Sequence, residues 1–190
     1  MPFTRVHMRL LPIAAPAAGV LALALVSAPA SQAAVTCARA GATANEANRH
    51  QLGRSTLCLL NVERRKRGLN ELRLNKRLST AARKHGSDMV RRRYFSHTSR
   101  SGATFVDRIR RSGYLQGAFS WMVGENLAWG AGSRSSPRAT VRAWMHSPGH
   151  RRNILTGRYH HIGIGVVRGA PARVGPLPAA TYTTDFGFKR

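Results

Sequence analysis

The sequence predicts an α+β fold in which helices pack over a small antiparallel sheet. Apolar residues recur at helical spacing through residues 46–93. Two serine–proline pairs, at 136–137 and 147–148, are typical helix starts, because serine caps a helix and proline suits its first position. Strand-like patterns come only later, at 162–167 and 180–188. Helices that precede the strands are typical of the α+β class.

The first two helices have clear signals at their ends. A helix is expected over residues 46–67, ended by Gly68, and its basic last turn suits the helix dipole. Residues 69–74 form a bridging segment with three leucines. Asn75 is a suitable N-cap for a second helix over residues 76–93.

The middle of the chain is predicted to be less regular. Thr104 is expected to cap a short third helix that Gly113 ends. Residues 114–134 are predicted to be a loop with one short strand at 125–128. The glycines of the 162–167 strand indicate that another backbone approaches it closely.

The N-terminus predicts export. Residues 1–10 carry two arginines and no acid, an apolar run follows to residue 26, and small residues then offer cleavage sites, which is the pattern of a secretory signal peptide. A transmembrane anchor is the alternative, but the apolar run is short and contains two prolines. We expect a secreted, extracellular, soluble monomer without a membrane anchor. Its predicted parts are a signal peptide at 1–33, an N-terminal arm at 34–50 and a folded domain at 51–190.

The chain is strongly basic, with 31 lysines and arginines against 7 acidic residues and a formal net charge of +24. Such a charge attracts polyanions. Export and the scatter of the arginines argue against nucleic acid as a partner, so anionic polymers or phospholipid head groups of the cell envelope fit better. The alternative is that arginine abundance follows genomic composition and serves only solubility.

Both cysteines, Cys37 and Cys58, follow the predicted cleavage region. An oxidising exterior favours a disulfide between them, which would tie the arm to the first helix. Two free thiols are the alternative. They form no cluster that suits zinc or an iron–sulfur centre.

Three short segments each hold one polar side chain in an apolar or turn-rich setting. These side chains are His97 in Tyr-Phe-Ser-His, Glu125 in Gly-Glu-Asn and His150 in Ser-Pro-Gly-His. Glu125 is one of only 7 acids and lies near Trp121 and Trp129, so it is not expected to be a solvated surface charge. Two histidines and a glutamate from distant segments predict a small polar cleft.

The order of six motifs resembles the CAP superfamily. This group holds the cysteine-rich secretory, antigen 5 and pathogenesis-related 1 proteins and is also called the SCP domain. The motifs, which are closest to the short bacterial secreted branch, are AARKHGSDM, YFSH, GENLAWG, VRAWMHSPGHRRNIL, HIGIGV and TTDFG. The resemblance covers residues 55–188 and implies a three-layer α-β-α sandwich.

The resemblance also implies a site. Family members gather two histidines and two glutamates in a cleft that binds divalent metals in some of them. By position, His97, Glu125 and His150 match three of these, while the second glutamate falls on Ser147, three residues after Trp144. The predicted metal ligands are therefore His97, Glu125 and His150 with water, a set that suits Zn²⁺ or another divalent ion at an open site.

Four further residues are predicted to contact a ligand near this cleft: Trp121, Trp129, Ser147 and His146. His146 neighbours the position of the missing acid and is a candidate substitute metal ligand. The alternative for the tryptophans is ordinary packing in the core.

Each predicted ligand also has a structural alternative. His97 is a candidate capping or core residue, the Glu125 carboxylate could accept backbone N–H groups, and His150 could pack its helix. His85, on the second helix, is interpreted as structural.

The favoured function is a binding module for a divalent metal, a lipid or another small apolar ligand. No serine lies in a Gly-x-Ser-x-Gly nucleophile elbow, and a cleft with one carboxylate cannot use a pair for acid–base catalysis. The alternative is a metal-dependent hydrolase of peptide or cell-wall material, with Glu125 as ligand or base. A third hypothesis is an interaction domain with a vestigial cleft.

Overall fold

The computed structural model describes residues 36–190, so the predicted signal peptide lies outside the described residues. None of the helices in this part of the chain is both long and apolar enough to span a bilayer. The elements, in chain order, are α1 (Arg49–Arg65), β1 (Arg73–Leu74), α2 (Lys76–Arg92), α3 (Phe105–Arg111), β2 (Trp121–Ala131), the 3-10 turn η1 (Gly132–Ser135), α4 (Pro137–His146), α5 (Pro148–Leu155), β3 (His161–Arg168) and β4 (Ala179–Lys189).

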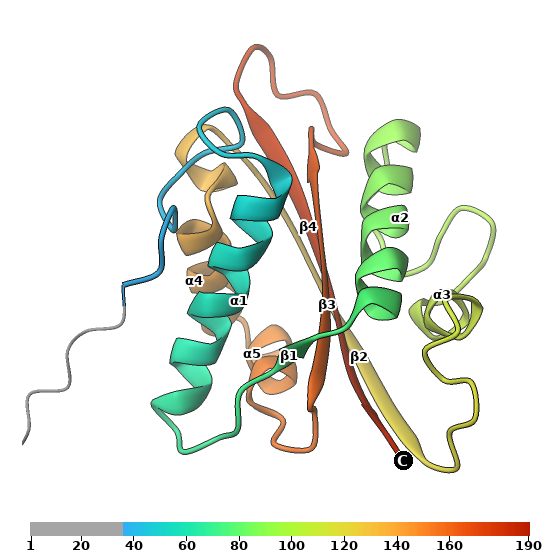
Figure 1. Cartoon of the computed structure of the whole chain (residues 1–190). Coiled ribbons are helices and arrows are strands. Elements are labelled where there is room, and N and C mark those ends of the chain that lie inside the picture. The colour runs from blue at the N-terminus through green and yellow to red at the C-terminus, as the bar shows by residue number, and fades with distance from the viewer. Residues whose placement is uncertain (1–35) are drawn as a thin grey trace, which may run out of the picture. The chain divides into compact units, whose positions relative to one another are not determined.

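The elements form three layers (Figure 1). The central sheet has the strand order β1-β3-β4-β2. Helices α1, α4 and α5 lie on one side of it, and α2 and α3 lie on the other. The α-β-α sandwich that the motifs imply is therefore confirmed.

The sheet is mixed, whereas an antiparallel sheet was predicted. β1 pairs with β3 in the parallel direction, with Arg73 opposite His161. The Arg73 amide donates to the His160 carbonyl at 2.9 Å, and the Asn75 amide donates to the Ile162 carbonyl at 2.8 Å. The predicted bridging segment thus adds a two-residue edge strand on its way from α1 to α2.

β2 is much longer than predicted. The expected strand at 125–128 extends over 11 residues, and each of them pairs with β4, from Trp121 opposite Lys189 to Ala131 opposite Ala179. Two glycines interrupt the apolar pattern of this stretch in the sequence. One of them, Gly124, is required by packing, because a Cβ there would lie 2.6 Å from the Tyr159 hydroxyl.

Local capping signals place most helix ends as expected. The Asn75 side chain accepts hydrogen bonds from the first turn of α2, and Thr104 and Asp107 form a capping box at α3. α1 begins at Arg49 rather than at residue 46, because Asn48 and Gln51 form the capping box of this helix. Residues 46–48 of the predicted helix are therefore not helical, and the predicted arm overlaps α1 by its last two residues.

The core lies mainly between the sheet and the α1, α4 and α5 layer. Its largest buried side chains include Trp144, Tyr182 and Phe186. On the other face, α2 lies directly on β3, because a Cβ at Gly163 or Gly165 would collide with the α2 backbone. The close approach predicted from these glycines is confirmed.

The predicted disulfide between Cys37 and Cys58 is present and ties the segment before α1 to that helix. Because it closes a loop of 21 residues, removing it is expected to lower the free energy of unfolding by about 3 kcal/mol. Urea unfolding of the oxidised protein and of a Cys37→Ser/Cys58→Ser variant measures this difference. Equal midpoints for the two proteins would show that the bond does not stabilise the fold.

Candidate functional site

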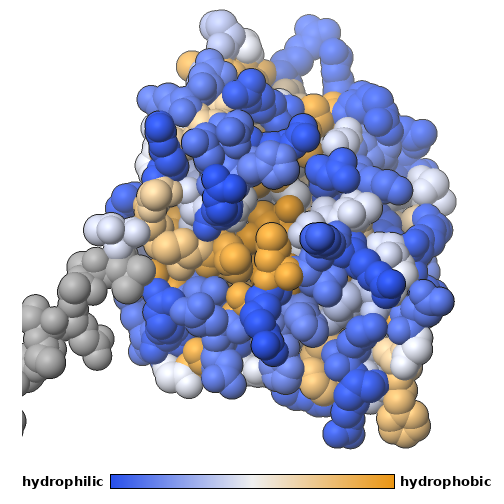
Figure 2. All heavy atoms as spheres, in the orientation of Figure 1, coloured by the Kyte–Doolittle hydropathy of each residue, from blue (hydrophilic) through white to orange (hydrophobic). Residues whose placement is uncertain are grey.

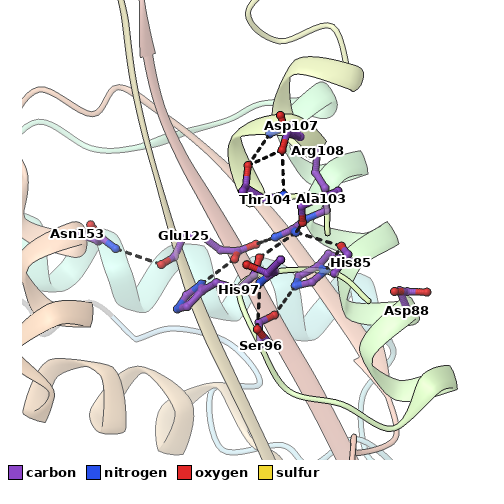
Figure 3. A network of polar contacts seen from close by, with 12 residues as sticks. His85, Asp88, Ser96, His97, Ala103, Thr104, Asp107, Arg108, Glu125 and Asn153 are labelled. Carbon is purple, nitrogen blue, oxygen red and sulfur yellow. Dashed lines mark hydrogen bonds and ion pairs between the residues drawn. The ribbon is translucent and has the colours of Figure 1, made fainter. Parts of the chain in front are cut away.

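The carboxylate of Glu125 lies at the centre of a buried polar network (Figure 3). Its side chain is fully buried, as expected for so scarce an acid. Oε2 accepts a hydrogen bond from Nη2 of Arg108 at 2.7 Å, and Oε1 accepts one from Nδ1 of His97 at 2.8 Å. The partners of this carboxylate are therefore an arginine and a histidine, not the backbone amides of the structural alternative.

β2, the edge strand of the sheet, carries both Glu125 and Asn126. Consecutive side chains of a strand point to opposite faces of the sheet, so these two contact different helical layers. Glu125 faces Arg108 of α3, whereas the next residue, Asn126, donates to the His150 carbonyl of α5 at 3.0 Å. Asn153 of α5 donates to the backbone carbonyl of Glu125 at 3.2 Å and to the Asn126 side chain at 2.8 Å. The Gly-Glu-Asn segment thus connects the two helical layers at one sheet edge.

His97 lies in the loop between α2 and α3, with 54% of its side chain exposed. An ionised carboxylate only accepts hydrogen bonds, so its contact with Glu125 requires the proton of His97 on Nδ1. In the neutral imidazole, Nε2 then keeps a free lone pair. Arg108 also donates to the His97 carbonyl at 2.9 Å, which fixes the backbone of this loop.

His150 lies in the first turn of α5, and its Nδ1 is 2.9 Å from the Ser147 hydroxyl. Ser147 occupies the position of the missing glutamate, so a hydroxyl takes the place of a carboxylate beside this ring. Burial, and then repulsion from His97, lower the pKa of His150. Burial and the neighbouring imidazole therefore both favour the neutral form of this ring.

The chemistry of these donors limits what this group of side chains can hold. Within residues 36–190, no group of three or more His, Cys, Asp or Glu side chains is placed to hold a metal ion. Both oxygens of Glu125 already accept hydrogen bonds from His97 and Arg108. The two imidazoles each have Nδ1 engaged, which leaves their Nε2 atoms as the candidate metal donors.

Comparison with known proteins places this arrangement in a family. The sequence model of the cysteine-rich secretory protein family, CAP, matches residues 57–184. The chain belongs to this family. The CAP domain therefore includes most of the fold and all three central residues, His97, Glu125 and His150.

Individual relatives agree with this assignment. The chain is 35% identical over 140 residues to the uncharacterized protein YkwD of Bacillus subtilis (strain 168), a match that covers 70% of the chain and 52% of YkwD. An extracellular SCP-domain protein of Bacillus anthracis str. Ames has a similar structure, with a TM-score of 0.60 and 28% identity over 74% of this chain and 41% of that one. An outer surface protein of Borrelia burgdorferi shares the fold, with a TM-score of 0.56 and 22% identity over 70% and 88% of the two chains. The chain spans about half the length of YkwD.

The other predicted ligand contacts lie at different places on this CAP domain. Trp121 and Trp129 are 43% and 39% exposed, and each lies four residues, or about 13 Å along β2, from Glu125. His146 is exposed, and its Nδ1 is 2.7 Å from the Arg142 carbonyl in its own helix. It lines a separate cavity between α1 and α4. Of these four residues, only Ser147 contacts one of the two histidines that are predicted as metal ligands.

Sequence reasoning missed Asp185, which lies opposite Glu125 in the β2–β4 pair. Asp185 is 1% exposed, and neither of its carboxylate oxygens has a hydrogen-bond partner among residues 36–190. Burial, and then the charge of Glu125, raise the pKa of Asp185 well above its usual range. The scarcity of acidic residues could have indicated it, because an acid inside the TTDFG strand is as unlikely as Glu125 to be a solvated surface charge.

Sequence reasoning also missed Arg108, because nothing distinguishes it among 31 basic residues.

His85 is interpreted correctly as structural: it is 1% exposed, and its Nε2 is 2.9 Å from the Ser96 carbonyl. Burial lowers the pKa of His85.

Proposed function

We propose that this CAP domain is a secreted binding module whose cleft binds a divalent metal ion through Nε2 of His97 and of His150. The hydrogen bond of 2.8 Å between His97 Nδ1 and Glu125 carries this proposal. A ligating histidine commonly donates its other N–H to a carboxylate, which fixes the tautomer and orientation of the ring. Ser147 is placed to do the same for His150 at 2.9 Å.

In this proposal Glu125 positions a ligand and is not a ligand itself. Its side chain is fully buried and is held by Arg108, whereas His97 is half exposed. Two imidazoles leave several coordination positions for water or for a donor group of a bound molecule. Such an open site suits a metal ion that links the protein to a second ligand.

The geometry gives the hydrolase alternative less support. A general base must reach the proton that it removes, but both oxygens of Glu125 accept hydrogen bonds from protein groups. The Ser147 hydroxyl contacts His150 but has no carboxylate in place to orient that histidine. Binding therefore accounts for the site with fewer assumptions than catalysis.

The predicted small apolar ligand has a candidate place away from the histidines. Figure 2 shows an apolar patch between α1 and α2 with hydrophilic side chains around it. A groove of about 580 Å³ lies there, and its apolar lining includes Leu57, Leu74 and Ile164. Volumes in this range accommodate small-molecule ligands.

Export and the basic surface complete the proposal. The expected signal peptide and the extracellular SCP-domain protein of Bacillus anthracis both support secretion. A formal net charge of +24 supports attraction to anionic components of a cell envelope.

Zinc titration by calorimetry at pH 7 tests the metal site. We expect saturable binding of about one Zn²⁺ per chain in the wild-type protein, and its loss in a His97→Ala/His150→Ala variant. A His50→Ala/His146→Ala variant is the matched control, because both of these histidines are exposed. Equal binding by all three proteins, or none by the wild type, would contradict the proposal.

The role of Glu125 is tested in the same titration. A Glu125→Gln substitution is expected to weaken zinc binding about 10- to 100-fold without abolishing it, as is typical when the partner of a ligating histidine is changed. Complete loss of binding in a variant that remains folded by circular dichroism would instead make Glu125 a direct ligand.

A further inference from the structure

A second polar site lies on the opposite side of the sheet from α5. A cavity of about 500 Å³ is lined by residues of α2, of α3 and of the serine-containing loop that joins them. Five arginines and one lysine line it, and Asp88 is the one carboxylate among its lining residues. The cavity is therefore far more cationic than a typical small-molecule pocket.

Three of these cations are held by no direct polar contact in the part of the chain that the structure describes. The side chains of Arg83, Lys84 and Arg111 are exposed and make no salt bridge or hydrogen bond within residues 36–190. Like charges held around one concave surface repel each other, so an anion that enters the cavity relieves this repulsion.

The single acid in the lining is already neutralised. Asp88 forms salt bridges with Arg91 at 3.0 Å and with Arg92 at 3.3 Å. It also accepts a hydrogen bond from the Tyr94 hydroxyl at 2.6 Å. The carboxylate therefore does not offset the three unpaired cations.

The inner wall of the cavity is polar and fixed. It includes His85 and Arg108, which are 1% and 9% exposed, and both lie in the network of Figure 3. Ser99 joins them, because its hydroxyl accepts from Arg108 at 3.2 Å and lies 3.5 Å from His85 Nδ1. Arg108 Nε is buried without a hydrogen-bond partner in the described chain. This wall is a built feature of the fold and not a chance gathering of surface side chains.

We propose that the α2–α3 cavity binds a ligand that carries two or more negative charges on phosphate groups. A carboxylate brings one charge, whereas a phosphate monoester brings about two near neutral pH, which better matches three unpaired cations. Arginine and hydroxyl groups are the usual partners of phosphate oxygens. A volume of about 500 Å³ is large enough for a diphosphate or a phosphate ester.

The lining of this cavity shares Arg108 with the Glu125 network but contains neither His97 nor His150, so either proposal can fail alone. The probe is inorganic pyrophosphate, titrated by calorimetry into the metal-free protein at low and at physiological salt. We expect a Lys84→Gln/Arg111→Gln variant to bind it at least about tenfold more weakly than the wild type. Both side chains are exposed and unpaired in residues 36–190, so the substitutions are not expected to affect folding.

The matched control removes the same charge elsewhere. Arg54 and Arg173 are exposed and lie outside the cavity, so an Arg54→Gln/Arg173→Gln variant is expected to change the affinity less than about twofold. Equal weakening in the two variants would overturn the proposal in favour of the general positive field. Absence of pyrophosphate binding to the wild type, together with absence of vesicle binding, would also overturn it.

A second arm identifies the source of the phosphate. Vesicles of phosphatidylcholine with and without phosphatidate are sedimented with the wild type and both variants. If the wild type and the control variant sediment with the phosphatidate vesicles and the Lys84→Gln/Arg111→Gln variant does not, the site binds a lipid head group. Pyrophosphate binding without such sedimentation assigns it to a soluble or polymeric phosphate.

Discussion

An Arg108→Met substitution is expected to lower the free energy of unfolding by about 3–5 kcal/mol, because it leaves the carboxylate of Glu125 buried without its cation. The side chain of Arg108 is 9% exposed and that of Glu125 is 0% exposed, so water cannot replace the lost contact. Arg108 also donates to the carbonyls of His97 and Ala103, at 2.9 and 3.0 Å. Urea unfolding followed by circular dichroism at pH 7 measures the difference.

Two further variants make this result specific. Arg110 lies on the same helix with 61% of its side chain exposed, so Arg110→Met is expected to change stability by less than about 0.5 kcal/mol. An Arg108→Met/Glu125→Leu variant removes both charges and is expected to be more stable than Arg108→Met alone. A double variant that loses as much as the two single variants together would show that the pair is not coupled.

The sequence located the centre of the site because the signals there are local. A scarce acid and two histidines inside turn-rich motifs predicted His97, Glu125 and His150, and the structure places Glu125 in contact with His97. What the sequence did not predict are partners from other elements. Arg108 approaches Glu125 from α3 and Asp185 lies opposite it on β4, and neither relation leaves a trace in local composition.

The same distinction separates the correct elements from the incorrect ones. At the helix starts Asn75, Thr104 and Ser136, the capping side chain accepts hydrogen bonds from backbone amides within the next three residues, so a pattern of residue types predicts these starts. The length of β2 depends on 11 pairs with a strand about 60 residues away. The strand propensity of a short stretch of sequence carries no information about pairing with a distant strand, so the sequence predicts most of β2 as a loop.

An Asp185→Asn substitution is expected to stabilise the protein at pH 7 by about 1–3 kcal/mol, because the buried carboxyl group must either bear an unpaired charge or take up a proton at this pH, whereas an amide carries neither cost. Asp185 is 1% exposed and its carboxylate has no hydrogen-bond partner within residues 36–190. An asparagine at this position is uncharged, and its amide can donate toward Glu125 across the strand pair. Thermal and urea unfolding of the two proteins provide the comparison.

The pH dependence of this gain tests its cause. Burial and then the charge of Glu125 raise the pKa of Asp185 in the folded state, and Arg108 only partly opposes them. The folded protein therefore holds this proton more tightly than the unfolded chain, whose aspartates titrate near pH 3.9. As the pH rises above about 4, wild-type stability must fall relative to that of the variant, and the difference should nearly vanish at pH 4.

Asp88→Asn serves as the control, because Asp88 is partly exposed and paired with two arginines, so its removal is expected to bring no gain at pH 7. A variant at Asp185 that is less stable than the wild type at pH 7 would mean instead that Asp185 is ionised and is held, with Glu125, by the single guanidinium of Arg108.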